Sequence, residues 1–164
     1  DAKYKRYIGN GAPKHFLSWS NNLTWRNFDL SVFFRGTFGF DVFNMRKYGM
    51  GLQGCGTDNV LRSAYLEDKN IRTGGGVISS YFLEDGSFIK LENVTLGYNF
   101  TPKNRKLLDN MRIYLSAKNL FTLTGYSGND PSIIDVNGIQ PGVDSNSAYP
   151  TATQLSLGVT LRFK

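Results

Sequence analysis

The fold of this chain is decided by the runs Asn93-Val94-Thr95-Leu96-Gly97-Tyr98-Asn99-Phe100 and Met111-Arg112-Ile113-Tyr114-Leu115-Ser116-Ala117-Lys118-Asn119-Leu120-Phe121. In the first run the even positions are apolar, and in the second the odd positions are mostly apolar. A period of two residues predicts β-strands, because successive side chains of a strand point to opposite faces. Each strand therefore has an apolar and a polar face, which soluble and membrane-spanning sheets have in common.

Three further segments repeat this alternation, and strands are expected near residues 14–26, 28–40, 87–100, 111–123 and 153–163. The apolar positions change from odd to even at Arg26-Asn27. That connection has room only for a tight turn, so the first two strands form a hairpin. The arms are about a dozen residues long, whereas a typical soluble strand has about five or six and a membrane-spanning strand about nine to eleven.

The connections alternate between short and long, and the two long ones are residues 41–86, the first long loop, and 124–152, the second long loop. Such loops are uncommon inside compact soluble domains but ordinary at one rim of a membrane barrel. The sequence contains no run of about 18 apolar residues that would make a membrane-spanning helix. The predicted fold is all-β, with about five long antiparallel up-and-down strands from the wall of a transmembrane barrel.

Composition argues against several classes of function. The 164 residues carry a formal net charge of +6, one Cys and one His. A single Cys55 and a single His15 are too few for a disulfide framework or an ordinary structural zinc site. The basic residues are scattered and match no nucleic-acid-binding signature, so no nucleic-acid partner is predicted. No cofactor is expected either.

Three motifs are candidates for phosphate binding, catalysis or metal binding. Gly74-Gly75-Gly76 lacks the strand before it and the Lys-Ser/Thr after it that a phosphate-binding loop needs. Glu84 and Asp85 point apart on an extended chain, so we interpret Glu84-Asp85-Gly86 as a turn and predict no catalytic residue. The last loop carries oxygen ligands without EF-hand spacing, and no metal site is predicted, although calcium is the alternative for Asp130, Asp135, Asn137 and Asp144.

Two sets of side chains are candidates for function. Aromatic residues near the long-loop ends of the strands, Phe38, Phe40, Tyr126 and Tyr149, suit an interfacial girdle or stacking against a ligand. The predicted ligand-binding residues at the outer rim are Phe40, Tyr126, Asp130 and Tyr149. The charged residues on the polar strand faces are costly against lipid, so they are predicted to face the lumen or a plug: Arg26, Asp29, Arg35, Arg112 and Lys118.

At these residues the chain resembles the C-terminal part of SusC/RagA-type TonB-dependent outer-membrane transporters. The resemblance covers nearly the whole chain in the family's order, and it rests on Ser20 to Gly36, on Ser80-Tyr81-Phe82-Leu83-Glu84-Asp85-Gly86-Ser87-Phe88-Ile89-Lys90-Leu91-Glu92-Asn93-Val94-Thr95-Leu96-Gly97-Tyr98, on Arg112 to Thr122, and on Tyr126 and Asp130-Pro131. Two positions depart from the family's pattern: Lys164 follows the final aromatic Phe163, and Ser132 follows Asp130-Pro131 where an acidic residue is common.

The resemblance implies a barrel of about 22 strands in a bacterial outer membrane, with lipid around its apolar belt. It implies long loops outside, short turns and the C-terminus at the periplasm, and a plug domain that this chain lacks. A TonB complex and a SusD-like lipoprotein would be partners, and a glycan oligosaccharide or a peptide the substrate. Since about five strands cannot close a barrel, the chain is expected to be part of a longer protein.

Two other functions remain open from the sequence. One is a soluble or secreted β-domain that binds a ligand or a protein through its long loops. The other is a passive porin or adhesin barrel without TonB coupling. The first would bury its apolar strand faces in a core, and the second would lack the plug.

Overall fold

The structure is a computed structural model that describes residues 5–52, 59–66, 78–102, 108–134, 138–145, 149 and 151–164. The chain divides into two compact units. The sheet unit comprises Phe16–Gly36, Ile89–Leu123 and Thr151–Lys164. The loop unit comprises Asp1–His15, Thr37–Phe88 and Thr124–Pro150. Cys55 and Gly74-Gly75-Gly76 lie outside the described residues.

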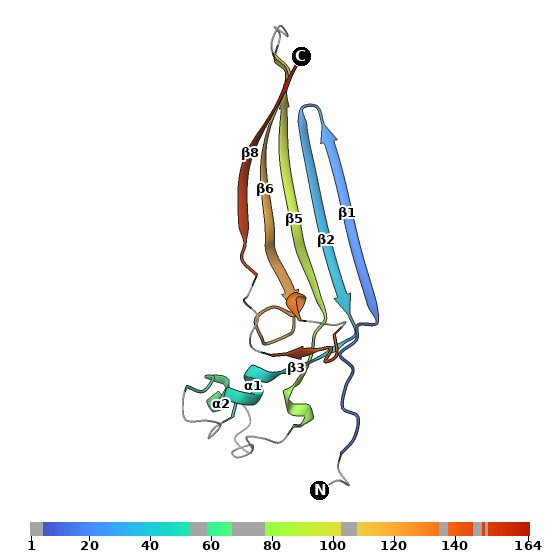
Figure 1. Ribbon diagram of the computed structural model, residues 1–164, viewed down its shortest axis with the longest axis vertical. Coiled ribbons are helices and arrows are strands. Elements are labelled where there is room, and N and C mark those ends of the chain that lie inside the picture. Colours follow the sequence, from blue (N-terminus) through green and yellow to red (C-terminus); the bar gives the residue numbers. More distant parts are fainter. Residues whose placement is uncertain are drawn as a thin grey trace. The chain divides into compact units, whose positions relative to one another are not determined.

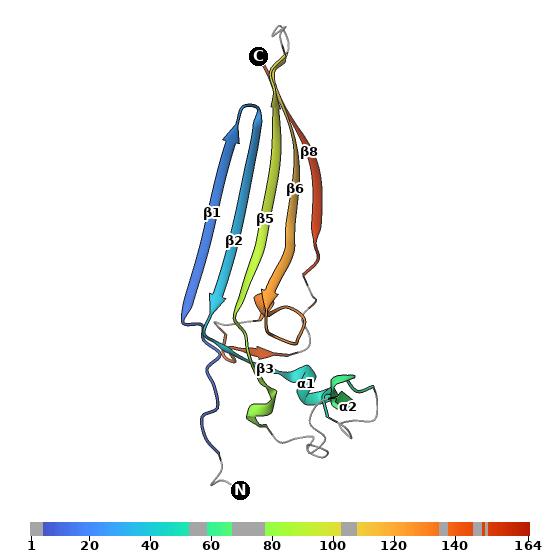
Figure 2. The ribbon, with the colours of Figure 1, turned by 180° about the vertical axis from the view of Figure 1, so that it is seen from behind.

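Five long strands form one sheet in the order β1-β2-β5-β6-β8 (Figure 1). Their bounds are β1 His15–Trp25, β2 Phe28–Phe38, β5 Phe88–Phe100, β6 Leu108–Thr124 and β8 Gln154–Phe163. Each long strand lies beside the next long strand of the chain, which is the up-and-down arrangement, and Figure 2 shows the same order from behind. The predicted all-β, antiparallel class is confirmed. The strands differ in extent from the prediction mainly in β6, which begins at Leu108, and in β2, which ends at Phe38.

The register between the last two strands separates the two faces of the sheet unit. Ile113 lies opposite Val159, and Leu115 lies opposite Leu157. On the other face, Ser116 lies opposite Ser156. Directly opposed residues of an antiparallel pair share a face, so the alternation in the sequence becomes one apolar and one polar surface.

The apolar face of the sheet unit is exposed. Leu157 is 75% exposed, Leu17 64% and Trp19 55%. Ring contacts such as Trp19 to Phe34, with centroids 5.6 Å apart, lie within this surface. The apolar face of the sheet unit is therefore not sealed in a core. Among the residues that the structure describes, no helix has the length and apolar character needed to cross a membrane.

The loop unit has a small sheet of its own with the order β4-β3-β7. Its elements are β3 Asp41–Asn44, α1 Met45–Met50, α2 Ser63–Leu66, the 3-10 helix η2 Ser80–Phe82, β4 Leu83–Asp85, the 3-10 helix η3 Pro131–Ile133 and β7 Val143–Asp144. β3 pairs antiparallel with β4 and parallel with β7. The sequence shows no alternation here because these strands have two to four residues, too few for a readable period.

The buried apolar residues that form clusters lie in the loop unit. One cluster contains Phe40, Val42, Phe88, Tyr126 and Ile134. A second joins Leu52 and Phe82, with Phe43, Tyr48 and Tyr81 packed against them. The loop unit thus has an ordinary apolar core, built from segments predicted as loops together with Phe40 and Phe88 from the ends of two predicted strands.

Candidate functional site

An ion pair spans three strands on the polar face of the sheet unit. Asp29 on β2 accepts from Arg112 on β6, with Arg112 Nε 3.1 Å from Asp29 Oδ1 and Nη2 bonded to Oδ2. The strand between them in the sheet is β5. Strands two apart are separated by about 10 Å, so the two side chains must cross above β5. The side chain of Arg112 is 33% exposed and that of Asp29 is 26% exposed.

Gly97 of β5 leaves the space in which Asp29 and Arg112 meet. A Cβ at position 97 would lie 2.6 Å from Asp29 Oδ2 and 2.7 Å from Arg112 Nε. Those separations are too short for a real side-chain carbon, so any other residue would displace the pair. Asn99, two residues further along β5, donates from Nδ2 to Asp29 Oδ1 at 2.7 Å and completes the carboxylate's partners.

The same band of contacts continues to the last strand. The guanidinium of Arg112 lies 5.0 Å from the ring centroid of Tyr114. Tyr114 is opposite Gly158 on β8, and the tyrosine ring occupies the space that a Cβ of residue 158 would need. A polar band therefore crosses from β2 to β8 over two glycines, with each glycine beneath a large polar side chain.

A second polar cluster lies further along β5. Arg35 Nε donates to Glu92 Oε2 at 2.9 Å, and Ser116 Oγ donates to Asn93 Oδ1 at 3.3 Å. Ser116 also accepts from Thr95 Oγ1 at 3.1 Å. Glu92 and Asn93 are consecutive, yet both reach side chains of the polar face. This interruption of the alternation is typical of a β-bulge.

The five residues predicted to face the lumen have four different surroundings. The structure brings Asp29 and Arg112 together and pairs Arg35 with Glu92. Arg26 lies in the turn between β1 and β2 with φ 53°, and its guanidinium is 5.2 Å from the ring centroid of Trp25. Lys118 is exposed and lies opposite Gln154 of β8.

Sequence reasoning missed the residues that hold these charges in place: Glu92, Gly97, Asn99 and Tyr114. A signal was available for Gly97, because a glycine inside a strand indicates a bulge or a close approach. The approach itself depends on which strands are neighbours, which the pattern of one strand does not give.

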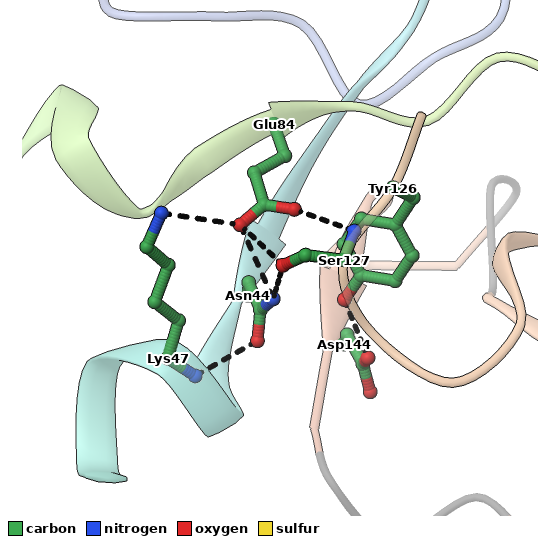
Figure 3. Close-up of polar contacts among 6 residues, drawn as sticks. All are labelled: Asn44, Lys47, Glu84, Tyr126, Ser127 and Asp144. Carbon is green, nitrogen blue, oxygen red and sulfur yellow. Dashed lines mark hydrogen bonds and ion pairs between the residues drawn. The ribbon is translucent and has the colours of Figure 1, made fainter. Parts of the chain in front are cut away.

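Glu84 is the centre of a second polar cluster, in the loop unit (Figure 3). Its carboxylate accepts from Ser127 N and from Ser127 Oγ, each at 2.8 Å. Asn44 Nδ2 donates to Glu84 Oε1 at 3.4 Å, and Lys47 Nζ lies 3.5 Å from the same oxygen. The prediction of a turn at Glu84 is corrected, because Glu84 belongs to β4 and the turn begins at Asp85, which accepts from Ser87 N at 2.9 Å.

The side chains around Glu84 are held by their own elements. Asn44 caps α1, where its Oδ1 accepts from Lys47 N at 2.8 Å. Tyr126 OH donates to Asp144 Oδ2 at 2.6 Å, as Figure 3 shows beside the Glu84 cluster. Burial, and then the hydrogen bond to Asp144, raise the pKa of the Tyr126 phenol. Tyr126 is therefore a protonated donor across the ordinary pH range.

The predicted ligand-binding residues lie in very different surroundings. Phe40 is 2% exposed and Tyr126 6%, both within the first apolar cluster. Asp130 is 7% exposed and caps η3, accepting from Ser132 N at 2.8 Å. Tyr149 is 94% exposed. A ligand role for these residues stays a prediction, and of the four only Tyr149 presents its side chain to solvent.

The described residues contain no group of three or more His, Cys, Asp or Glu side chains arranged to hold a metal ion. Of the alternative calcium ligands, Asp130 and Asp144 are engaged in the hydrogen bonds above. Asp135 and Asn137 lie outside the described residues.

These features define a class of protein. The sheet unit has one exposed apolar face and one face of paired charges, on strands of 10 to 17 residues. That is the construction of a transmembrane β-barrel wall, in which lipid-facing and lumen-facing residues alternate.

Known proteins of this class are similar to the chain, although no protein-family model matches it. TonB-dependent receptor P3 of Formosa agariphila is 26% identical over 180 residues, covering 97% of this chain and 17% of the relative. TonB-dependent receptor SusC of Bacteroides thetaiotaomicron is 28% identical over 156 residues, covering 90% of this chain and 15% of the relative. The chain thus spans less than a fifth of the length of these relatives.

Solved structures give the same fold. The RagAB peptide importer in its closed-closed state superposes with a TM-score of 0.72 at 23% identity, covering 95% of this chain and 18% of that chain. Its open-open state gives a TM-score of 0.65 at 22% identity, covering 92% and 17%. The resemblance to the C-terminal part of SusC/RagA-type TonB-dependent transporters is confirmed.

Proposed function

We propose that this chain forms part of the wall and two outer loops of a TonB-dependent importer in a bacterial outer membrane. The observation that carries the proposal is the exposed apolar face of the long strands, with Leu157 at 75% and Leu17 at 64% exposure, opposite paired charges. A soluble domain would have to cover that surface, whereas acyl chains cover it in a membrane.

The direction of the strands supports one orientation. The short connection at Arg26-Asn27 and the end of β8 belong to one end of the sheet, and the two long loops connect strands at the other. In outer-membrane barrels short turns are periplasmic and long loops extracellular. We therefore propose that the loop unit is extracellular and that the C-terminus is periplasmic.

The charges of the polar face are proposed to line the lumen or to face a plug contributed by the rest of the protein. Asp29 and Arg112 neutralise each other, as do Arg35 and Glu92, so this part of the wall presents dipoles and hydrogen-bonding groups more than net charge. The substrate is proposed to be a glycan oligosaccharide or a peptide, with a SusD-like lipoprotein as partner, by analogy with the relatives.

The test uses the full-length protein that contains this chain. We expect it to be extracted only with detergent and to support uptake of an oligosaccharide or peptide that stops when TonB coupling is removed. Uptake that persists without TonB coupling would favour the passive barrel. A monodisperse, cooperatively melting protein without detergent would favour the soluble β-domain and overturn the proposal.

A further inference from the structure

The two long loops are joined through a common core and a common sheet. Val42 of the first loop, and Phe40 directly before that loop, share an apolar cluster with Tyr126 and Ile134 of the second. β3 of the first loop pairs with β7 of the second, and Phe43 N donates to Gly142 O at 2.7 Å. Residues about a hundred positions apart in the sequence therefore form one folded body.

Glu84 adds a polar junction between the same two loops. Two of its donors, Ser127 N and Ser127 Oγ, come from the second loop, and two, Asn44 and Lys47, come from the first. The Glu84 side chain is 14% exposed and that of Lys47 17%. Removing the carboxylate would leave several donors with little access to water, and such groups are costly to leave unpaired.

The donors to Glu84 are also held in place by contacts that do not involve its carboxylate. Asn44 is 2% exposed and is held by its cap of α1, and Ser127 follows Tyr126, whose hydroxyl is bonded to Asp144. A charged group that meets preorganised donors loses little conformational entropy in binding them. The arrangement suits a junction that is closed all the time more than one that closes on binding.

We propose that the parts of the two long loops that the structure describes act as one rigid cap coupled through Glu84, so that a ligand or partner that displaces one part must displace the other. Glu84 is then a positioning residue, since it acts on the loops and not on a substrate. The inference rests on the proposed function only for the placement of the cap outside the membrane. Two independent flaps are the arrangement that it excludes.

The experiment is amide hydrogen exchange on the full-length protein in detergent, with strands β5 and β6 as the internal check of folding. The reporter of the first loop is Leu61 N, which donates to Met50 O at 2.7 Å within that loop, and the reporter of the second is Ile134 N, which donates to Pro131 O at 3.4 Å within the second loop. Phe82→Leu loosens the second apolar cluster, whose members all belong to the first loop.

In a coupled cap, Phe82→Leu raises exchange at both reporters by the same factor, because both amides open together. Glu84→Ala is expected to raise exchange at both by about tenfold, and to confine the effect of an added Phe82→Leu to the first loop. Glu84→Gln retains an oxygen acceptor for Ser127 N and should fall between Glu84→Ala and the unchanged protein.

Exchange confined to the first loop in the Phe82→Leu protein would overturn the proposal, as would a Glu84→Ala protein with unchanged exchange at Ile134. Both readouts are independent of uptake. A protein that fails to import but shows joint exchange would retain the cap and lose the proposed function, whereas an importing protein with separate exchange would do the reverse.

Discussion

The sheet unit and the loop unit of this chain bury opposite kinds of residue. In the sheet unit Leu157 is 75% exposed, while the side chains of Asp29 and Arg112 are about a third exposed or less. In the loop unit Val42 is fully buried within an apolar cluster, although Ile139 on the surface of that unit is fully exposed. Since apolar surface is stable in an apolar environment, the difference supports the proposal that lipid surrounds the sheet unit and water the loop unit.

The largest effect is expected from a charge placed on the apolar face of the sheet unit. We expect Leu157→Arg to cost about 2–4 kcal/mol, because a guanidinium near the bilayer midplane is poorly solvated. Folded full-length protein in the outer membrane should fall severely, measured by heat-modifiable gel mobility. Ser156→Arg is the matched control, because Ser156 shares the polar face with Ser116. Equal loss from both substitutions would contradict a lipid-facing surface.

The two faces of the strands could be predicted from the sequence, because the alternation in residues 93–100 and 111–121 is local and long. The prediction was incomplete at the start of β5. There the apolar residues change from odd, Ile89 and Leu91, to even, Val94 and Leu96, across the break at Glu92-Asn93. The switch is visible in the sequence, but the contacts of Glu92 with β2 and of Asn93 with β6 that accompany it are long-range.

The loop unit was far less predictable. Glu84 and Ser127 are 43 residues apart, and no local pattern in the sequence indicates that they meet. Phe40 and Tyr126 were predicted to bind a ligand because aromatic residues near the long-loop ends of the strands can stack against one, and Asp130 because it lies in the outer loop. In the structure their burial comes from the pairing of one loop with the other, which is a long-range property that composition does not encode.

The next largest effect is expected on the polar face, from a substitution of Gly97 beneath the ion pair. We expect Gly97→Val to destabilise the barrel by about 1–3 kcal/mol, because its Cβ would occupy the space of Asp29 and Arg112 and displace both. Thermal midpoints of the folded full-length protein would measure the effect. Gly125→Val is the control, since a Cβ there would meet no atom within 4 Å. Similar midpoints for the two variants would rule out the close approach at Gly97.

Removal of one charge should have a smaller effect than filling the space above β5. Asp29→Ala leaves Arg112 without its bidentate partner and Asn99 Nδ2 with only its longer hydrogen bond, 3.4 Å to Asn27 O, and the expected cost is about 1–2 kcal/mol after allowance for partial exposure. The same thermal midpoint measures it. If Asp29→Ala and Arg112→Ala are each costly, the double variant should cost less than their sum, since the interaction can be lost only once. Strict additivity would show that the pair contributes nothing.

The smallest effect is expected at the more exposed ion pair of the same face. The side chains of Arg35 and Glu92 are 39% and 38% exposed, so solvent screens their attraction more than it does that of Asp29 and Arg112. We expect the coupling energy between Arg35→Ala and Glu92→Ala to be at most about 1 kcal/mol, measured by a double-mutant cycle on thermal midpoints. A coupling larger than that of Asp29 with Arg112 would mean that the Arg35 pair is shielded in the complete protein. The plug would then be the natural source of that shielding, because a domain inside the lumen covers the polar face and leaves the apolar face in lipid.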